Sequence, residues 1–303
     1  MDKSDKVILI TGAAGTQGEA VAFKLLEAGF KVRALVFKSD ASKLKDAGAE
    51  IVKGNFDEPE SLIKAMEGVY GVFSMQNLDF AGDDAERRHA KNLADAALKA
   101  GVKQVVHTSV AQAGNHEKFP HWGTGRWWEK YWTDKSDAMQ TIINAGFEYW
   151  TVLKPAGLMD NYIQPKANYI NPHLKQGEIL TAFRPETKVQ VVSAEDVGSF
   201  ATAAFKNSKA YHQKMIDLAS EALTMTEIAD IISRVTRKKV KAVHVSAEEA
   251  KAKGLFPLAV SSQEWSNEVG YNVDIEALKQ YQIPLTSFED WAQKHKNEFL
   301  IEI

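Results

Sequence analysis

The stretch Val7-Ile8-Leu9-Ile10-Thr11-Gly12-Ala13-Ala14-Gly15-Thr16-Gln17-Gly18 decides the fold of this chain. Its first four residues are β-branched or leucine, which predicts a strand buried on both faces, as in a parallel sheet. Three glycines follow at the spacing G-x-x-G-x-x-G, and an amphipathic helical pattern covers residues 17–28. Glycines in this position let backbone N–H groups approach a pyrophosphate at a helix N-terminus. The stretch predicts a dinucleotide-binding loop; the alternative is turn glycines in a fold that has lost its cofactor.

The alternation of strand and helix continues outward from this loop. Apolar runs predict strands at residues 31–37, 50–53, 71–75, 104–110 and 149–153, with helices at residues 60–67, 83–100 and 136–145 between them. Four Ala-Gly pairs stand just before apolar runs, where glycine suits the end of a helix; they are Ala28-Gly29, Ala47-Gly48, Ala100-Gly101 and Ala145-Gly146. These repeated β-α-β units predict an α/β fold with a doubly wound parallel sheet.

The rhythm of the sequence changes after Pro155. Residues 157–185 are irregular and contain three prolines. Capping-box patterns further along predict helix starts at Ser193, Thr224, Ser246 and Thr286. We therefore expect a dinucleotide-binding domain over residues 1–155. A smaller α/β substrate lobe is expected over residues 156–303, with about residues 188–218 returning to the first domain.

Composition excludes several classes of function. The net charge of −3 over 303 residues gives no general attraction to nucleic acid. The chain has no cysteine, which excludes disulfides, thiolate metal sites and cysteine nucleophiles. Its histidines have no metal-like spacing, and we expect no metal site. No run reaches the ~20 apolar residues of a membrane span, and residues 7–10 are too few for a signal sequence. We expect a cytoplasmic protein without nucleic-acid or membrane partners.

The end of the second expected strand bears on the choice of cofactor. NAD-binding proteins usually place an acid there to bind the ribose 2′-hydroxyl. Here the residues are Val36-Phe37-Lys38-Ser39, and the first acid is Asp40. Lys38 could meet a 2′-phosphate, which favours NADP(H) over NAD(H). The alternative is a solvated lysine on a surface loop.

Tyr131 and Lys135 form the pattern Y-x-x-x-K, and on a helix they share one face. A nearby lysine cation favours the phenolate form of tyrosine, so Tyr131 could give a proton to a carbonyl oxygen as hydride arrives. Tyr131 also lies in an aromatic run with Trp122, Trp127, Trp128 and Trp132, and its alternative role is packing or substrate contact. These indoles suit a flat apolar substrate, or they are ordinary core. For Lys135 the alternative is a plain surface lysine.

The chain resembles the NmrA-like family, atypical members of the short-chain dehydrogenase/reductase superfamily, from about residue 7 to residue 299. The motifs that carry the resemblance are residues 11–18 (TGAAGTQG), 32–35 (VRAL), 68–73 (GVYGVF), Lys135 before a helix, 153–155 (LKP), 193–197 (SAEDV) and 288–295 (FEDWAQKH). The resemblance implies a Rossmann domain with a smaller C-terminal lobe and a nicotinamide in the cleft between them. It also implies either NADP(H)-dependent reduction or dinucleotide sensing without known turnover.

The resemblance further implies roles for single residues. Lys135 reaches the nicotinamide ribose, and Val110 stands where the usual catalytic serine is expected, so Thr108 or Ser109 would have to substitute. Phe37 stands where many members of the family have an arginine for the 2′-phosphate, and Lys38 would take over that contact. The other expected cofactor contacts are Gly12, Gly15, Thr16, Gln17 and Gly18 at the pyrophosphate, Asn55 and Phe56 at the adenine, Ser74 and Gln76 at the ribose, Thr108 after the fifth strand, and Pro155 and Gly157 at the nicotinamide.

Two functions follow from these observations. The first is an NADP(H)-dependent oxidoreductase that transfers hydride to a small apolar carbonyl or quinone, with Tyr131 and Lys135 as catalytic residues. The alternative is a non-catalytic NADP(H)-binding redox sensor of the NmrA type. The Y-x-x-x-K pattern favours the first and Val110 favours the second. The expected partner is a small apolar, aromatic substrate, and the sequence leaves a homodimer open.

Overall fold

The structure, a computed structural model, describes residues 5–78 and 82–302. The chain divides into two compact units, each assembled from separate segments. Unit 1 comprises Met1–Gly114, Lys130–Lys154 and Ala194–Asp217, and unit 2 comprises Asn115–Glu129, Pro155–Ser193 and Leu218–Ile303. The division of labour between a cofactor domain and a substrate lobe stays a prediction.

Unit 1 is built on a seven-stranded sheet in the order β10-β6-β5-β4-β1-β2-β3. Its strands are β1 (Val7–Ile10), β2 (Lys31–Val36), β3 (Glu50–Lys53), β4 (Gly71–Ser74), β5 (Gln104–Thr108), β6 (Tyr149–Pro155) and β10 (Lys214–Leu218). Adjacent strands from β6 to β3 pair in parallel. The strand order reverses between β1 and β4, and open α/β sheets bind ligands at such a switch point. The predicted doubly wound parallel sheet is confirmed.

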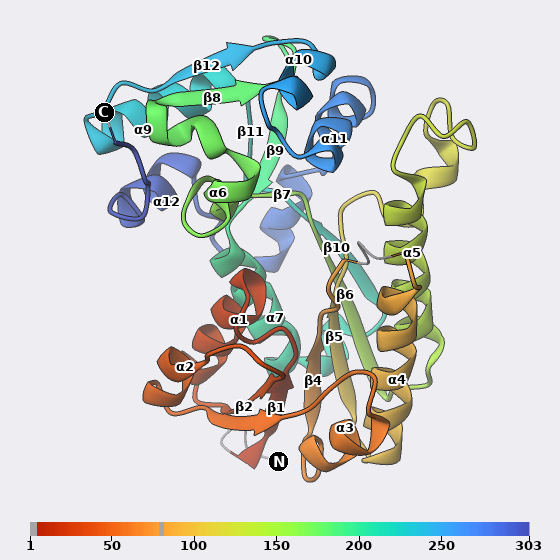
Figure 1. The fold of residues 1–303 in the computed structure, drawn as a ribbon. Coiled ribbons are helices and arrows are strands. Elements are labelled where there is room, and N and C mark those ends of the chain that lie inside the picture. The colour runs from red at the N-terminus through yellow and green to blue at the C-terminus, as the bar shows by residue number, and fades with distance from the viewer. Residues whose placement is uncertain (1–4, 79–81, 303) are drawn as a thin grey trace. The chain divides into compact units, whose positions relative to one another are not determined.

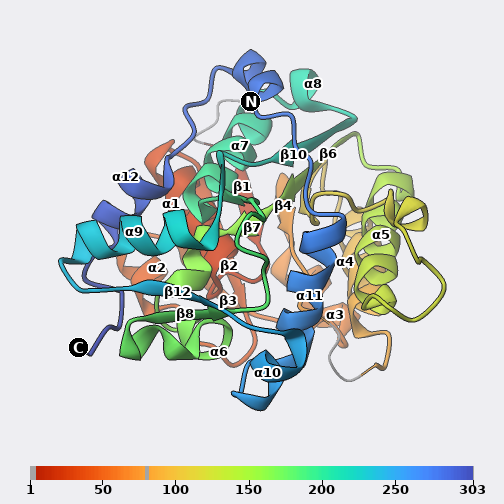
Figure 2. The ribbon, with the colours of Figure 1, turned by 90° about the horizontal axis from the view of Figure 1, so that it is seen from above.

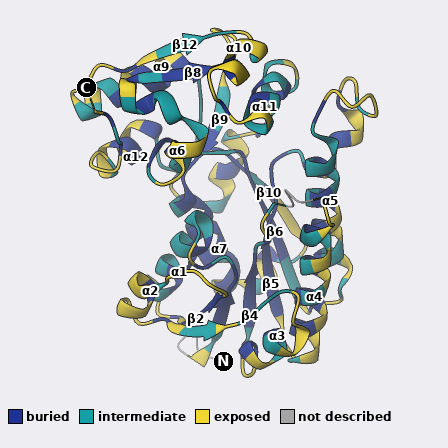
Figure 3. Cartoon of the chain, viewed as in Figure 1, coloured by how far each residue is buried: buried dark blue, intermediate teal, exposed yellow. Residues whose placement is uncertain are grey.

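Helices cover both faces of this sheet (Figure 1). On one face lie α1 (Thr16–Glu27) and α7 (Ala194–Lys206), and on the other α3 (Pro59–Ala65), α4 (Ala85–Lys99) and α5 (Glu129–Asn144); α2 (Ser42–Asp46) and α8 (Ser208–Tyr211) are short. Successive residues of β1 point to opposite faces. Leu9 joins the core beneath α3, α4 and α5, whereas Ile8 lies near Phe205 of α7. The central strands β1, β4 and β5 are accordingly buried along most of their length (Figure 3), whereas the edge strand β3 has exposed ends.

Helices α1 and α7 approach each other closely at Gly198. A Cβ on that residue would lie 2.9 Å from the Ala20 carbonyl oxygen, so no larger residue fits without a shift of the backbone. Two views show the helices side by side (Figures 1 and 2). This contact fixes α1, whose N-terminus carries the glycine loop.

Unit 2 is a mixed α/β unit with two small sheets, ordered β11-β9-β7 and β12-β8. Its core surrounds Phe288 and Trp291 and includes Ile228 and Ile232. Its strands are β7 (Gly157–Leu158), β8 (Glu178–Thr181), β9 (Val189–Val192), β11 (Glu221–Leu223) and β12 (Lys241–His244); its α-helices are α6 (Ala167–Ile170), α9 (Met225–Thr236), α10 (Ala247–Ala252), α11 (Pro257–Glu268) and α12 (Phe288–Lys294). Among the described residues, no helix has the length and apolar character needed to cross a membrane.

The local signals in the sequence are largely confirmed. Gly29, Gly48, Gly101 and Gly146 all have positive φ at helix ends, at 85°, 99°, 78° and 94°. Thr224 forms the predicted capping box with Glu227, and Ser246 accepts a hydrogen bond from the Glu249 amide. The fourth cap is one residue later than predicted, because Ser287 rather than Thr286 accepts from the Asp290 amide.

The predicted start at residue 136 of the last helix before Pro155 is wrong. Helix α5 begins at Glu129. Its first two turns bury Trp132 together with Asp134, a pair that leaves no apolar stripe for a periodicity argument to find. The earlier start places Tyr131 and Lys135 on one regular helix.

Thr11 anchors the glycine loop to the end of β4. Its hydroxyl is fully buried, accepts a 2.7 Å hydrogen bond from the Met75 amide, and lies 2.9 Å from the Met75 carbonyl and 3.1 Å from the Phe73 carbonyl. Thr202 in α7 is also buried, at 6% exposed, but its hydroxyl has no hydrogen-bond partner within the described residues. The two threonines therefore form a matched pair.

We predict opposite effects of removing these two hydroxyls. Thr11→Val leaves the Met75 amide without its partner and should lower the free energy of unfolding by about 1–3 kcal/mol. Thr202→Val removes an unpaired buried hydroxyl and should leave stability unchanged or raise it. Urea unfolding of both variants measures the difference. Equal losses in the two variants would contradict this account of the anchor.

Candidate functional site

The loop between β1 and α1 forms a cradle that only glycine fits. Gly12 has φ +62°, and a Cβ on it would lie 2.2 Å from the Met75 methyl. A Cβ on Gly18 would lie 2.2 Å from the Gly12 carbonyl oxygen. The Gly15 amide donates to that same carbonyl at 2.9 Å. The loop and the first turn of α1 are thus packed backbone against backbone.

This cradle presents main-chain donors at the start of a 12-residue helix. The N-cap is Gly15, which offers no side chain to cap the first amides of α1. Such amides, together with the helix dipole, suit the pyrophosphate of a dinucleotide. The residues predicted to bind it lie together in this single turn: Gly12, Gly15, Thr16, Gln17 and Gly18.

Buried polar side chains gather at the ends of β4 and β5 beside the cradle. The Gln76 amide nitrogen donates to the Ser74 hydroxyl at 3.1 Å, and that hydroxyl lies 3.1 Å from His107 Nδ1. The Thr108 hydroxyl donates to Gln17 Oε1 at 2.8 Å. Gln76 is 4% exposed, and its Oε1 has no partner within the described residues. Ser74, Gln76 and Thr108 thus lie at the ends of β4 and β5, and their contacts with a cofactor stay a prediction.

His107 was not predicted to take part in this cluster. It is buried at the end of β5, and burial, together with the nearby Lys135 ammonium, lowers the pKa of its imidazole to about 3. The ring is therefore neutral at physiological pH. Within the described residues no three His, Asp or Glu side chains are placed to share a metal ion.

The residues after β2 lie at the surface. Phe37 is 56% exposed, and Lys38 Nζ lies 4.9 Å from the centre of its ring. Asp40 turns back on its own segment, where it accepts hydrogen bonds from the Ser42 amide and hydroxyl at 2.9 and 3.0 Å. These bonds hold the pKa of the Asp40 carboxyl below its usual value. The first cation after β2 is Lys38.

The stretch after β3 makes contacts within unit 1. The side-chain Nδ2 of Asn55 donates to Glu58 at 3.1 Å, and its side-chain Oδ1 accepts from the Asp57 backbone amide at 3.1 Å. The ring of Phe56 stacks on His89 with centroids 5.0 Å apart. Both side chains thus have partners in the protein, and their role at an adenine stays a prediction.

Lys135 is held by a residue that the sequence did not single out. Its Nζ lies 2.6 Å from Glu86 Oε1, and the two side chains are only 12% and 3% exposed. Burial raises the pKa of the Glu86 carboxyl, and the Lys135 ammonium opposes that rise. In the sequence Glu86 is an acid in the first turn of a helix, a position that predicts only an exposed partner for the helix dipole.

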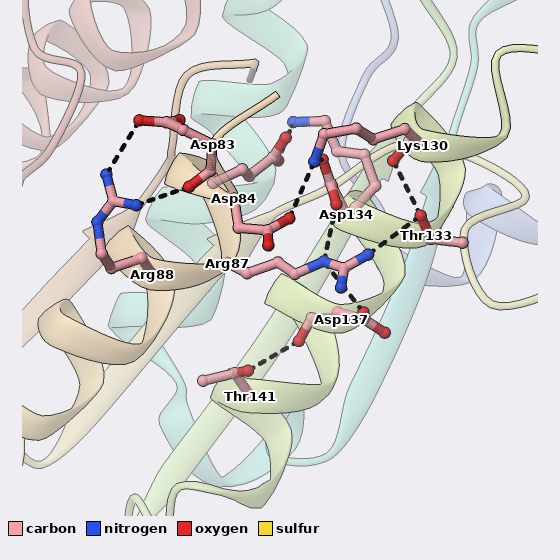
Figure 4. A network of polar contacts seen from close by, with 11 residues as sticks. Asp83, Asp84, Arg87, Arg88, Lys130, Thr133, Asp134, Asp137 and Thr141 are labelled. Atoms are coloured by element: carbon pink, nitrogen blue, oxygen red, sulfur yellow. Dashed lines mark hydrogen bonds and ion pairs between the residues drawn. The ribbon is translucent and has the colours of Figure 1, made fainter. Parts of the chain in front are cut away.

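Further ion pairs tie α4 to α5 around this one (Figure 4). Asp134 is 3% exposed and accepts from Arg87 and from Lys130, both at 2.7 Å. Arg87 also lies 3.2 Å from Asp137. The two helices are therefore joined by charged groups as well as by apolar packing.

The loop after β5 offers two hydroxyls near α5. Ser109 donates to the Lys135 carbonyl oxygen at 3.3 Å, and Thr108 donates to Gln17. Val110, at the place of the expected serine, is 5% exposed and belongs to the core. The substitution of Thr108 or Ser109 for the expected serine stays a prediction.

The tryptophan run is divided between the two units. Trp127 and Trp132 are buried, and Trp127 donates to the Pro120 carbonyl at 2.6 Å. Trp122 is half-buried and lies 4.8 Å from His116, ring centre to ring centre. Trp128 is also half-buried. Packing accounts for the two buried indoles.

Two predicted cofactor contacts belong to the other unit. Pro155 and Gly157 lie in unit 2, after the end of unit 1's second segment at Lys154. Unit 1 brings together the glycine loop, the cluster at β4 and β5, and the Tyr131–Lys135 helix. The predicted contact of Pro155 and Gly157 with the nicotinamide stays a prediction.

We predict that His107 makes the protein less stable toward unfolding as the pH falls below about 6.5. The unfolded imidazole titrates near 6.5 and the native one near 3, so the unfolded chain binds the extra proton between these values. The contribution of His107 to the free energy of unfolding is therefore fully present above pH 6.5. It falls as the pH drops, by about 2 kcal/mol at pH 5. Urea unfolding at pH 7 and pH 5 measures how much stability is lost between them. This loss should be smaller by about that amount in His107→Gln than in the wild type. Equal losses in wild type and variant would show that His107 is not the group responsible.

Comparisons with known proteins agree with this architecture. The model of the NmrA-like family matches residues 4–292. The chain is 24% identical over 304 residues to the (4-alkanoyl-5-oxo-2,5-dihydrofuran-3-yl)methyl phosphate reductase of Streptomyces griseus, covering 98% of this chain and 100% of that protein.

Two solved structures share the fold across the chain. One is an NADPH-dependent quinone oxidoreductase from Escherichia coli complexed with NADPH, 20% identical, with a TM-score of 0.74 and coverage of 95% of this chain and 99% of that one. The other is NmrA, a negative transcriptional regulator, in complex with NADP, 19% identical, with a TM-score of 0.73 and coverage of 96% and 95%. Since the family model spans nearly the whole sequence and the sheet has the expected strand order, the chain belongs to the NmrA-like family.

Proposed function

We propose that this protein is an NADP(H)-dependent reductase that transfers hydride to a small apolar carbonyl or quinone. The observation that carries the proposal is the glycine cradle at the start of α1, in which a Cβ on Gly18 would lie 2.2 Å from the Gly12 carbonyl. A curated relative that spans the whole chain is a reductase. One structural neighbour is an NADPH-dependent quinone oxidoreductase.

Residues of unit 1 would hold the pyrophosphate, the 2′-phosphate and the nicotinamide ribose of a dinucleotide. The first amides of α1 would receive the pyrophosphate, and Lys38 the 2′-phosphate. Ser74, Gln76 and Lys135 would face the nicotinamide ribose. The unpartnered Gln76 Oε1 is a buried acceptor suited to a hydroxyl or amide donor of the cofactor. The nicotinamide, when bound, supplies the hydride.

Tyr131 would complete the reduction. It lies one turn before Lys135 on α5, so its hydroxyl and the ammonium project from the same face of the helix. In the proposed reaction the substrate carbonyl carbon gains the hydride and its oxygen gains the phenolic proton, which yields an alcohol. A quinone accepts the same hydride and proton and becomes a hydroquinone.

The second candidate is a dinucleotide sensor without turnover. Two observations favour it: Val110 is buried where a catalytic serine is expected, and the Lys135 ammonium is already engaged by Glu86. A structural neighbour, NmrA, is a transcriptional regulator in complex with NADP. Tight NADPH binding without turnover of any quinone or aryl aldehyde would favour the sensor over the reductase.

We predict that Tyr131→Phe lowers turnover with a quinone or aryl aldehyde by about 10²–10⁴-fold, because the general acid is lost. The phenylalanine ring keeps the edge contact with Trp132, whose centroid lies 5.2 Å away, so stability and NADPH affinity should be retained. NADPH oxidation and calorimetry measure the two properties. As a control, Tyr149→Phe at the start of β6 should leave both unchanged. Full turnover in Tyr131→Phe would mean that the proton comes from another group.

We predict a preference for NADPH over NADH that depends on Lys38. A charge-assisted contact to the 2′-phosphate is worth about 1.5–3 kcal/mol, and the exposure of Lys38 places the preference at the lower end, about tenfold. Lys38→Ala should remove it, and Lys45→Ala, an exposed lysine of α2, should not. Calorimetry with both cofactors tests the prediction. Equal affinity of the wild type for NADPH and NADH would refute it.

A further inference from the structure

We propose that Glu86 is a positioning residue for Lys135, an inference that rests on the proposed function. It holds the lysine ammonium in the orientation from which it reaches the cofactor ribose. The starting observation is the 2.6 Å distance between Lys135 Nζ and Glu86 Oε1 in a pair with hardly any exposure. No other acid is placed within ion-pair distance of Lys135 in the described part of the chain.

The pair leaves Lys135 with donors to spare. An ammonium has three N–H groups, and the bond to Glu86 uses one of them. The other two remain for a ribose hydroxyl and for the phenol of Tyr131. Because a lysine side chain has four rotatable bonds, a fixed acceptor removes most of its conformational freedom before the cofactor arrives. Glu86 therefore pre-organises the ammonium.

The position of Glu86 in the fold suits this role. It is the second residue of α4, so the positive end of the helix dipole stabilises its carboxylate. From α5 it is faced by Lys135, Asp134 and Lys130, of which Asp134 raises and Lys130 lowers its pKa. His107 on β5, which feels the charge of Lys135, is neutral. The Glu86 carboxylate is thus the counter-ion of the Lys135 ammonium.

Asp134 provides a matched control between the same two helices. It is 3% exposed, like Glu86, and it binds Lys130 and Arg87 instead of Lys135. Its loss should weaken the joint between α4 and α5 without releasing Lys135. A purely structural role for Glu86 would make the loss of either carboxylate weaken NADPH affinity to the same extent.

The first test uses the cofactor-free protein and needs no activity. The rate at which an acylating reagent modifies each lysine is followed by mass spectrometry. We expect Glu86→Ala to raise the rate at Lys135 about tenfold, since a charge-assisted hydrogen bond is lost, and Asp134→Asn to raise it at Lys130 only. Glu86→Gln, which keeps an acceptor of the same shape, should lie between wild type and Glu86→Ala. An unchanged rate at Lys135 in Glu86→Ala overturns the proposal.

The second test is NADPH affinity by calorimetry. Glu86→Ala should raise the Kd about tenfold, Glu86→Gln should restore most of the affinity, and Asp134→Asn should leave the Kd unchanged. In a Lys135→Met background Glu86→Ala should have no further effect, because no ammonium remains to be positioned. An equal loss in that background overturns the proposal. If the wild type fails to bind NADPH, the proposed function fails, and the lysine modification rates still decide whether Glu86 holds Lys135.

Discussion

The architecture of unit 1 depends on the close approach of three backbone segments: the turn at Gly12, the first turn of α1 and the end of β4. Glycine at position 18 lets the first two segments touch, since a Cβ there would overlap the Gly12 carbonyl, and a Cβ on Gly12 would overlap the Met75 side chain after β4. Thr11 holds the third by its bonds to Met75. The result is a patch of main-chain donors beside the carboxyl ends of β1 and β4, where the strand order reverses. The candidate site is laid out around this patch.

Polar groups that are buried near the patch are organised in pairs and chains. Gln76, Ser74 and His107 form one chain, Thr108 and Gln17 form a pair, and Glu86 and Lys135 form another. Each would be costly to bury alone, because a buried polar group without a partner loses its bonds to water. The exception is Gln76 Oε1, and a ligand that supplies a donor would remove this cost.

Most of the fold of unit 1 could be predicted because its signals are local. The strand at residues 7–10 is apolar on both faces, and the glycines at the helix ends adopt positive φ for reasons that involve only neighbouring residues. The start of α5 was missed because Asp134 is buried by its partners Arg87 and Lys130, which come from different turns and helices. Periodicity in one segment carries no information about such partners.

The same distinction applies to the candidate site. The glycine loop and the Tyr131–Lys135 spacing are local patterns, and the sequence contains them in full. Glu86 lies 49 residues before Lys135, and nothing in its own neighbourhood marks it as buried. His107 likewise joins the site only through the pairing of β4 with β5. Contacts of this kind depend on the sheet, so they can be named only once the strands are placed.

The two units exchange chain at five points, after residues 114, 129, 154, 193 and 217. Neither unit is therefore a continuous stretch, and a single cut of the chain releases neither of them. During synthesis on the ribosome, unit 1 lacks its edge strand β10 until residue 218 has been made. Residues 115–129 of unit 2 are synthesised long before the C-terminal helices with which they form that unit. Long-range closure of this kind slows folding relative to a protein whose domains follow one another in sequence. Both units are thus expected to be completed only late in synthesis.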